Sequence, residues 1–570
     1  MCIRRILYAA VFLLAGSRAA ESADVPPTSA AQTVARIHWL GMKHLSGETN
    51  AAHLMAIWNL PESGRLKRQT LDKLSLAPWP LLHRNVDTNA AALLRPLLDD
   101  LVADESCLEI RQTTNQPDEL VLAIRLDEPR AALWRTNLAR ILESLTGIHP
   151  VPAPEPGYGW SLKKHHDPNL LELTRVGGWT IVGAAQDHNG LLDDLLTRIR
   201  QGQPPLPVGP TNDWLAADLN LSRVFLAGVG TSRGDVPARE IAGGTGAPLD
   251  TARTAQRAVP TRSEGAMCDF VFPGILSPSI TNLYHLHLAV TGESGNVVTR
   301  GTLEFSRPLD LTLPPWNIPT NLIDEQLASF TLIRGFKPWL ESSPAWRNLQ
   351  IGPPPDQICI WAVLGFPMQS YFVAPLPDAS NEVYRLAGWV LQKEPVWFGT
   401  NELAIFARSK QSNGLEWKGP PYMMPFLLSI TVSNQDFVYG GGLVSPTASP
   451  MLPNALQATL NRPDLVYHDS EATGLRIDQW LYMGQFVRFV LHQAQLPPHS
   501  AGMLWLKAIS PRLGDSVTDI TQTGPDQLSF TRQSSIGFTG FELNLLVDWL
   551  ESPQFPCGLY SLSAPPDPLP

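Results

Sequence analysis

Short segments of alternating hydrophobic and polar residues recur along this chain, with turn-forming residues between them. Residues 170–174 and 179–183 alternate on either side of a Gly-Gly pair, and residues 427–431 and 437–440 alternate on either side of Ser-Asn-Gln. Two alternating segments joined by so short a turn are typical of a β-hairpin. Further strands are predicted at residues 107–112, 120–126, 358–364 and 371–374. The strand content is therefore mainly antiparallel.

Apolar residues spaced three and four apart predict helices between these strands. The clearest amphipathic stretch is residues 90–102. Pro129 fits the first turn of a second helix, and Ser380 is a suitable N-cap for a third. Besides residues 90–102, the predicted helices cover residues 50–60, 68–76, 129–145, 191–199 and 381–392. The pattern predicts the α+β class, with a mainly antiparallel sheet packed with helices.

Three landmarks recur in the same order in the two halves of the chain. The first is a strand that ends in Gly-apolar-Lys, the second is the hairpin described above, and the third is Thr-Gly followed by Thr-Arg at one fixed spacing. The offsets are 294 from Gly41 to Gly335, 258 from Trp179 to Phe437 and 232 from Thr291 to Thr523. Insertions and deletions after a tandem duplication would produce such a drift.

The repeated landmarks predict two related tandem units, residues 30–313 and 319–570. The boundary falls in Pro308–Pro319, where four prolines rule out regular structure. Residues 228–264 are rich in Gly, Thr, Ala and Arg, and are predicted to be an irregular insertion in the first unit. After the third landmark, residues 302–305 and 541–544 are both predicted to continue as alternating strands.

The first residues have the pattern of an export signal, predicted over residues 1–22. Arg4-Arg5 precedes the apolar run of residues 6–16, and small residues permit cleavage after Ala19 or Ser22. The run is shorter than the ~20 residues of a permanent membrane anchor. A secreted or periplasmic protein is predicted, with a buried N-terminal helix as the alternative.

Charge and hydropathy narrow the classes of partner. The formal charge is −10 and no long run of Lys or Arg occurs, so nucleic acid is excluded as an expected partner. No later segment reaches 18 apolar residues free of charge, so no transmembrane segment is predicted in the mature chain. The sequence does not identify the partner. In the predicted compartment, an envelope protein or a polysaccharide is a possible class of partner. The sequence does not indicate the oligomeric state.

Four cysteines remain once Cys2 is removed with the signal. They are Cys107, Cys268, Cys359 and Cys557. An even number in an oxidising compartment permits two disulfides, but the wide spacing is equally compatible with buried free thiols. Both alternatives stay open.

The strongest catalytic motif is Gly230-Thr231-Ser232-Arg233-Gly234, which has the spacing of a nucleophile elbow. It makes Ser232 the candidate catalytic residue, with Asp310 and His468 as guesses for the acid and the histidine. Glycine-rich loops give the same pattern by chance, and no helix is predicted after the motif. No dinucleotide fingerprint with the correct glycine spacing occurs, so no cofactor is predicted.

His285-Leu286-His287 lies on a predicted strand, so both imidazoles should point to one face. These two residues are the candidate metal ligands, although a zinc site needs three or four donors and no others are identifiable. A solvated polar face is the alternative. Asp99-Asp100 and Asp193-Asp194 are predicted to be solvated acids on helix faces, because helix neighbours sit ~100° apart and cannot share one site.

Two function classes follow. The favoured one is a non-catalytic binding or structural protein of the cell envelope, because no set of nucleophile, base and orienting acid recurs in both halves. The alternative is a secreted serine hydrolase that uses the segment from Gly230 to Gly234, or an exported hydrolase with an unrecognised carboxylate pair.

Overall fold

The computed structural model describes most of the chain between residues 32 and 560. The described residues are 32–113, 116–153, 157–163, 169–206, 213–221, 283–323, 327–342, 346–347, 352–363, 369–398, 406–409, 414–417, 426–442, 454–490 and 495–560. The predicted signal over residues 1–22, the predicted insertion over residues 228–264, and Cys268 therefore lie outside them. No helix in the described part is long and apolar enough to cross a membrane.

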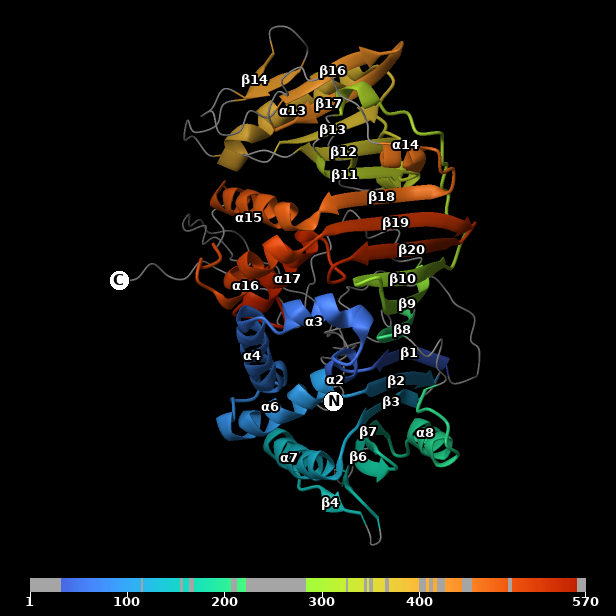
Figure 1. Ribbon diagram of the computed structural model, residues 1–570, viewed down its shortest axis with the longest axis vertical. Helices are drawn as coiled ribbons and strands as arrows, with labels where there is room; N and C mark the ends of the chain where they lie inside the picture. The colour runs from blue at the N-terminus through green and yellow to red at the C-terminus, as the bar shows by residue number, and fades with distance from the viewer. Residues whose placement is uncertain are drawn as a thin grey trace, which may run out of the picture.

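All the strands of the described chain belong to one 20-stranded sheet, and its neighbouring strands are antiparallel (Figure 1). The strands are β1 Gln32–Trp39, β2 Ser106–Thr113, β3 Gln116–Arg125, β4 Val151–Pro152, β5 Trp160–Lys163, β6 Asn169–Val176, β7 Trp179–Gln186, β8 Leu215–Asn220, β9 Leu283–Glu293, β10 Asn296–Phe305, β11 Leu327–Arg334, β12 Gln357–Val363, β13 Ser370–Pro375, β14 Phe406–Arg408, β15 Leu415–Trp417, β16 Phe426–Val432, β17 Gln435–Gly441, β18 Leu465–Ala472, β19 Asp515–Gly524 and β20 Gln527–Ser534.

Strand pairing runs without interruption from β4 at one edge to β14 at the other. The first ten strands are ordered β4-β5-β6-β7-β3-β2-β1-β8-β9-β10. The last ten are ordered β14-β15-β16-β17-β13-β12-β11-β18-β19-β20. Strands β10 and β20 pair with each other in the middle of the sheet (Figure 1).

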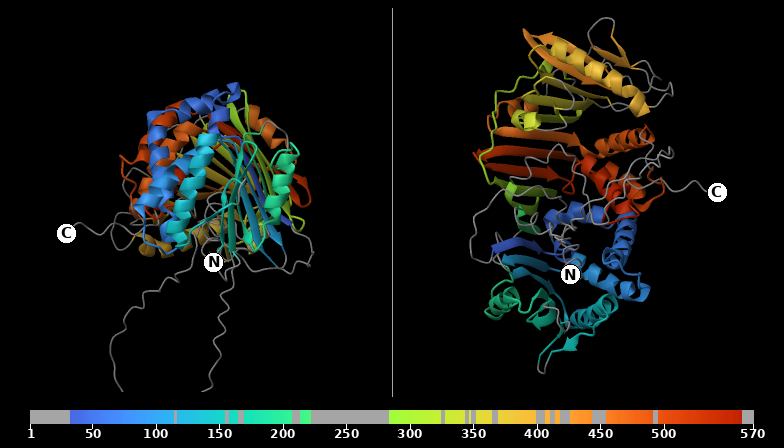
Figure 2. Two further views of the ribbon diagram at one scale, coloured as in Figure 1. Left: turned by 90° about the horizontal axis from the view of Figure 1, so that it is seen from below. Right: turned by 180° about the vertical axis from the view of Figure 1, so that it is seen from behind.

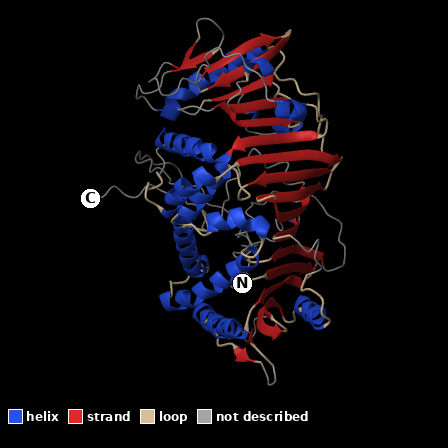
Figure 3. Ribbon diagram, viewed as in Figure 1, coloured by secondary structure: helices blue, strands red, loops and turns tan. Residues whose placement is uncertain are grey.

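The helices connect these strands and form a layer along the sheet (Figure 3). They are α2 Met42–Leu45, α3 Ala52–Trp58, α4 Pro61–Leu76, α5 Pro78–Leu81, α6 Thr88–Ala103, α7 Glu128–Thr146, α8 Gly190–Arg200, α11 Lys337–Ser342, α13 Ala379–Phe398, α14 Asn454–Leu460, α15 Thr473–Val490, α16 Ala501–Ile509 and α17 Gly540–Glu551. Short 3-10 turns occupy Thr49–Ala51, Thr320–Leu322 and Ser510–Arg512.

The two faces of the sheet are covered unequally. Alternation along β3 sends Ile124 toward α6 and α7, and sends Val121 and Ala123 toward α8. Helices α7, α13, α15 and α17 lie on the first of these faces, which we call the helix-rich face, whereas α8 and α14 lie on the opposite face (Figure 2). Between α8 and α14 the opposite face exposes Arg300 and Thr531 to solvent.

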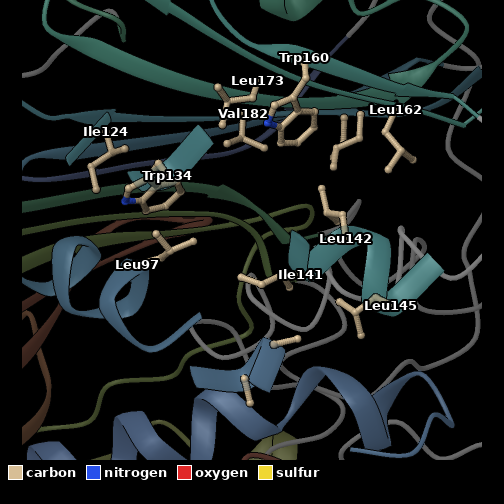
Figure 4. Packing of buried hydrophobic residues seen from close by; sticks show 14 of the residues in the cluster. Leu97, Ile124, Trp134, Ile141, Leu142, Leu145, Trp160, Leu162, Leu173 and Val182 are labelled. Carbon is tan, nitrogen blue, oxygen red and sulfur yellow. The ribbon is translucent and has the colours of Figure 1, made fainter. Parts of the chain in front are cut away.

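The largest hydrophobic cluster lies between β3, β5–β7 and the helices α6 and α7. Leu97 and Trp134 from these helices pack near Ile124, while Trp160 lies among the strand residues Leu173 and Val182 (Figure 4). Two tryptophans donate their indole N–H groups, Trp134 to the carboxylate of Asp100 at 2.8 Å and Trp160 to a backbone carbonyl at 2.9 Å. These two indoles are therefore satisfied in the core, whereas the indole N–H of Trp79 in the same cluster has no partner among the described residues.

Helices from the two halves share one core. Ile57 of α3 packs with Leu543 and Val547 of α17 and with residues of α16. Lys73 of α4 donates to the carbonyl oxygen of Leu550 at 2.6 Å, close to the end of α17. The helices inserted between β1 and β2 thus complete the helical layer of the second half.

The structure confirms the α+β class and the mainly antiparallel sheet. It corrects three local predictions. Residues 541–544 lie in α17 and not in a strand, because Thr539 caps a helix there with a Thr-Glu capping box. Asp100 is buried between Arg130 and Trp134, so it is not a solvated acid. Helix α13 begins at Ala379, which places Ser380 inside its first turn.

Candidate functional site

The densest group of buried charges lies on the helix-rich face of β18. Asp469 and Glu471 are two positions apart on this strand, so both side chains point to the same face. They are 7% and 6% exposed. Arg476, at the start of α15, is also buried. We call Asp469, Glu471 and Arg476, with the side chains that contact them, the polar cluster.

Cross-strand pairing extends the polar cluster over four strands. Asp469 is directly opposite Thr331 of β11 and Thr518 of β19, and Thr518 is directly opposite Arg532 of β20. The Thr331 hydroxyl donates to Asp469 Oδ1 at 2.6 Å, and Arg532 Nε donates to Thr518 Oγ1 at 2.9 Å. Directly opposed residues share a face, so the pairing aligns these polar groups in one row.

Glu471 belongs to a second row and joins the sheet to two helices. It is directly opposite Ser329 and Ser516, and its Oε1 accepts the backbone N–H of Gly540 at 2.6 Å. Gly540 is the first residue of α17, where a carboxylate is favoured by the helix dipole. Arg476 Nε lies 4.0 Å from Glu471 Oε2, an ion-pair distance that is too long for a hydrogen bond.

The polar cluster reaches solvent at one end. Arg532 Nη1 donates to Glu542 Oε2 at 2.7 Å, and the Glu542 side chain is 37% exposed. At the buried end, Arg476 Nε and Ser516 Oγ have no hydrogen-bond partner among the described residues. A buried donor or acceptor without a partner costs free energy, so these two atoms reduce the contribution of the cluster to stability.

Burial shifts the pKa of both acids upward. Loss of solvation raises the pKa of Glu471 to about 7; the N–H of Gly540 opposes this rise, and the Asp469 carboxylate adds to it. Burial also raises the pKa of Asp469, against the hydrogen bond from Thr331. Burial lowers the pKa of Arg476, while the two carboxylates favour its charged form. Strongly perturbed groups of this kind concentrate at functional sites.

A second group of polar residues lies on the opposite face of the same strand. His468 is directly opposite Asp519, and its Nδ1 is 2.7 Å from Asp519 Oδ1. Arg462 Nη1 donates to the other oxygen of Asp519 at 2.6 Å. Burial tends to raise the pKa of Asp519, but the bond to His468 and the ion pair with Arg462 hold it below its usual value.

This pair has the base–orienter geometry of a catalytic triad without the nucleophile. His468 Nε2 is buried and has no hydrogen-bond partner among the described residues. The carboxylate beside His468 is Asp519, and not the guessed Asp310. Ser232 and the segment Gly230–Gly234 lie outside the described residues.

The candidate metal ligands His285 and His287 lie on β9 and point to the opposite face of the sheet. His285 Nε2 is 2.7 Å from Asp218 Oδ1, and its Nδ1 is 3.6 Å from Glu304 Oε2. His287 is directly opposite Asp218. Within the described part of the chain, no group of three or more His, Cys, Asp and Glu side chains is arranged to hold a metal ion.

The sequence pattern did not indicate Asp469, Glu471 or Arg476 as candidate functional residues. Residues 465–472 read L-V-Y-H-D-S-E-A, a strand with polar groups at nearly every position. Acids at alternate positions 469 and 471 predict one shared face, but a sheet face rich in acids is usually solvated. The burial comes from α15 and α17, and neither helix was predicted.

The fold and the site together define an α+β protein with one long antiparallel sheet and a buried charged cluster beneath its helical layer. Comparisons with protein-family models, with curated protein sequences and with solved structures find no match to this chain.

Proposed function

We propose that this chain is an exported, non-catalytic binding protein made of two related tandem units, residues 30–313 and 319–570. The second unit carries the binding site, which is the polar cluster.

The two units repeat one strand order and one local irregularity. Adding ten to each strand number of the first ordering gives the second. The β1–β2 ladder skips a residue between Thr33 and Ala35, and the β11–β12 ladder skips one between Leu327 and Ser329. The two irregularities lie 294 residues apart along the chain, which equals the offset of the first sequence landmark. A bulge at the same place in two ladders is a feature that related sequences share.

Following the ladders outward from β1 and β11 gives further matches. Cys107 is directly opposite His38, and Cys359 is directly opposite Leu332, which is the equivalent of His38. Both cysteines are buried free thiols. The pairing continues through β2 and β3 to β7, and through β12 and β13 to β17. It matches residues of β7 to residues of β17 that lie 258 positions later, which is the offset of the hairpin landmark in the sequence. Two of the three sequence landmarks therefore agree with the strand register, whereas the third does not, because the register makes Gly301, and not Arg300, the equivalent of Arg532.

The observation that carries the proposal is a contrast between equivalent rows. In the first unit the two rows that correspond to the polar cluster are apolar, namely Ala35–Leu219–Leu286–Leu303 and Ile37–Ala217–Leu288–Gly301. In the second unit they are Ser329–Glu471–Ser516 and Thr331–Asp469–Thr518–Arg532. Leu219 of the first unit is therefore the equivalent of Glu471 in the second, and Ala217 is the equivalent of Asp469.

This contrast separates folding from function. The first unit builds the same strand framework from leucine, isoleucine and alanine, so the framework does not need buried charges. Burying charged groups costs free energy that good pairing only partly recovers. Retention of the costly residues in one unit is explained by a ligand that they contact, and Glu542 is the member of the cluster that is open to solvent.

Export is supported by the basic and apolar start of the sequence and by one disulfide. Cys557 is disulfide-bonded, whereas Cys107 and Cys359 are free. Disulfides persist in oxidising compartments and are rare in the cytosol.

Replacing Leu13 by arginine is expected to retain the protein inside the cell, because a charge in the middle of the apolar run prevents insertion of a signal. The check is cell fractionation with mass determination of the mature N-terminus, expected after Ala19 or Ser22. As a matched control, Leu40→Arg lies beyond the signal and should leave processing unchanged. An unprocessed cytosolic wild-type chain would contradict export.

Binding is tested by thermal shift against neutral oligosaccharides, acidic oligosaccharides and short peptides. We expect one class to raise the unfolding midpoint of the wild type by several degrees, because a ligand that binds only the folded state stabilises it. The double variant Glu471→Leu/Arg476→Met should lose the shift. Leu219→Met, at the equivalent position of the first unit, should keep it. The site is wrong if the double variant keeps the shift, and the function is wrong if no class stabilises the wild type.

The second candidate function is a secreted serine hydrolase that uses the segment Gly230–Gly234. The observation in its favour is the free Nε2 of His468, oriented by Asp519. A serine-reactive probe that labels the wild type, and neither Ser232→Ala nor His468→Ala, would support this alternative against the binding protein.

A further inference from the structure

Helix α17 is held to the sheet through the buried end of the polar cluster. The N–H of Gly540 is bonded to Glu471, and a β-carbon at Gly540 would lie 2.9 Å from the Arg476 side chain and from the Ile477 backbone. Helices α15 and α17 therefore meet over β18 in close contact. The ring of Trp480 of α15 packs against that of Phe541 of α17 at a tilt of 56°, with ring centroids 4.8 Å apart.

The charges that face Glu471 do not balance. The titratable and charged groups around it are Tyr467 and Asp469 of β18, Arg476 of α15, Glu542 of α17 and Arg532 of β20. Strands β11 and β19 contribute only hydroxyl groups, and His468 points to the opposite face. Arg532 is paired with Glu542, so Arg476 alone faces two carboxylates. One negative charge is left over in a buried site.

We propose that Asp469 and Glu471 share one exchangeable proton, and that this proton acts as a latch that fastens α15 and α17 to the sheet. With the proton in place, one carboxylate pairs with Arg476 and the other is neutral. Without it, two buried carboxylates repel each other beneath the helices. The latch goes beyond the proposed function and holds whether or not the cluster binds a ligand.

The raised pKa of Glu471 fixes the direction of the effect. A carboxyl whose pKa is higher in the folded than in the unfolded state contributes stability that is full below the unfolded value of 4.5, and that is lost as the pH rises to about 7. The folding equilibrium constant should fall about 100-fold over this range. The helical layer is therefore tightest in mild acid and looser above neutrality.

The test is denaturant unfolding of the full chain between pH 5 and pH 8.5, followed by circular dichroism. We expect the wild type to lose stability as the pH rises and Glu471→Gln to lose much less, because the amide cannot ionise. Glu119→Gln is the matched control, since Glu119 also accepts N–H groups at a helix start, those of Gly190 and Leu191. It should keep the wild-type slope. Equal slopes in wild type and Glu471→Gln would overturn the latch.

A second measurement covers the case in which Glu471→Gln does not fold. Infrared difference spectra of the wild type, recorded between pH 6 and pH 9, should lose the C=O stretch of one protonated buried carboxyl. Asp469→Asn should move that loss to lower pH, because the Asp469 carboxylate no longer raises the pKa of Glu471. No protonated carboxyl at pH 6, or a band that Asp469→Asn leaves unchanged, would refute the shared proton. Ligand binding does not enter these readouts, so the latch can fail while the proposed function stands.

Discussion

Glu471→Leu alone is expected to lower the free energy of unfolding by about 1–3 kcal/mol at pH 8, because a buried N–H is left unsatisfied while Asp469 remains as the carboxylate that faces Arg476. The same change removes the acceptor of the Gly540 N–H. Adding Arg476→Met should lower the free energy of unfolding further, since it leaves the buried Asp469 without the arginine that faces it. Denaturant unfolding of the two single variants and the double variant gives the coupling energy.

The first unit provides the comparison for this cycle. Leu219→Met at the equivalent position should cost less than ~1.5 kcal/mol, as a volume-conserving change in a core does. If the double variant loses as much as the two single variants together, the coupling energy is zero, and Glu471 and Arg476 do not act as a pair.

Ile57→Ala should lower the free energy of unfolding by about 2–5 kcal/mol, through lost burial and the cavity left behind. Ile57 lies in the first half, yet it packs against Leu506, Leu543 and Val547 of the second. We therefore expect calorimetry to show the second half destabilised by a substitution in the first. Leu76→Ala on α4 is the control; this leucine is 39% exposed, so its loss should be small. Normal stability of the second half in Ile57→Ala would contradict the shared core.

The elements that the sequence predicted best are those whose pattern is set locally. The helix over residues 129–145 appears as α7, between Glu128 and Thr146, because its capping Asp127, Pro129 and apolar spacing agree. The hairpins of β6–β7 and β16–β17 lie where alternation and turn residues placed them.

The elements that were missed depend on distant partners. Helix α15 is apolar on several sides, so its periodicity is weak, and it is stabilised by packing against α17 and the sheet. Residues 541–544 alternate like a strand, but the capping box at Thr539 and Glu542 selects a helix. Asp469 and Glu471 could be placed on one face from their spacing. Their burial could not be predicted, because it depends on helices α15 and α17, which the sequence pattern did not indicate.

The sheet ends in two outer strands that have no further neighbour in the described chain, β4 and β14. An outer strand offers unpaired backbone groups to any passing chain, and a sheet this long would be a template for fibre growth. Here β4 has two residues, one of them Pro152, which has no N–H to donate, and β14 has three. Such short outer strands present few hydrogen-bonding groups. This protects a sheet of 20 strands against edge-to-edge association with other copies of the chain.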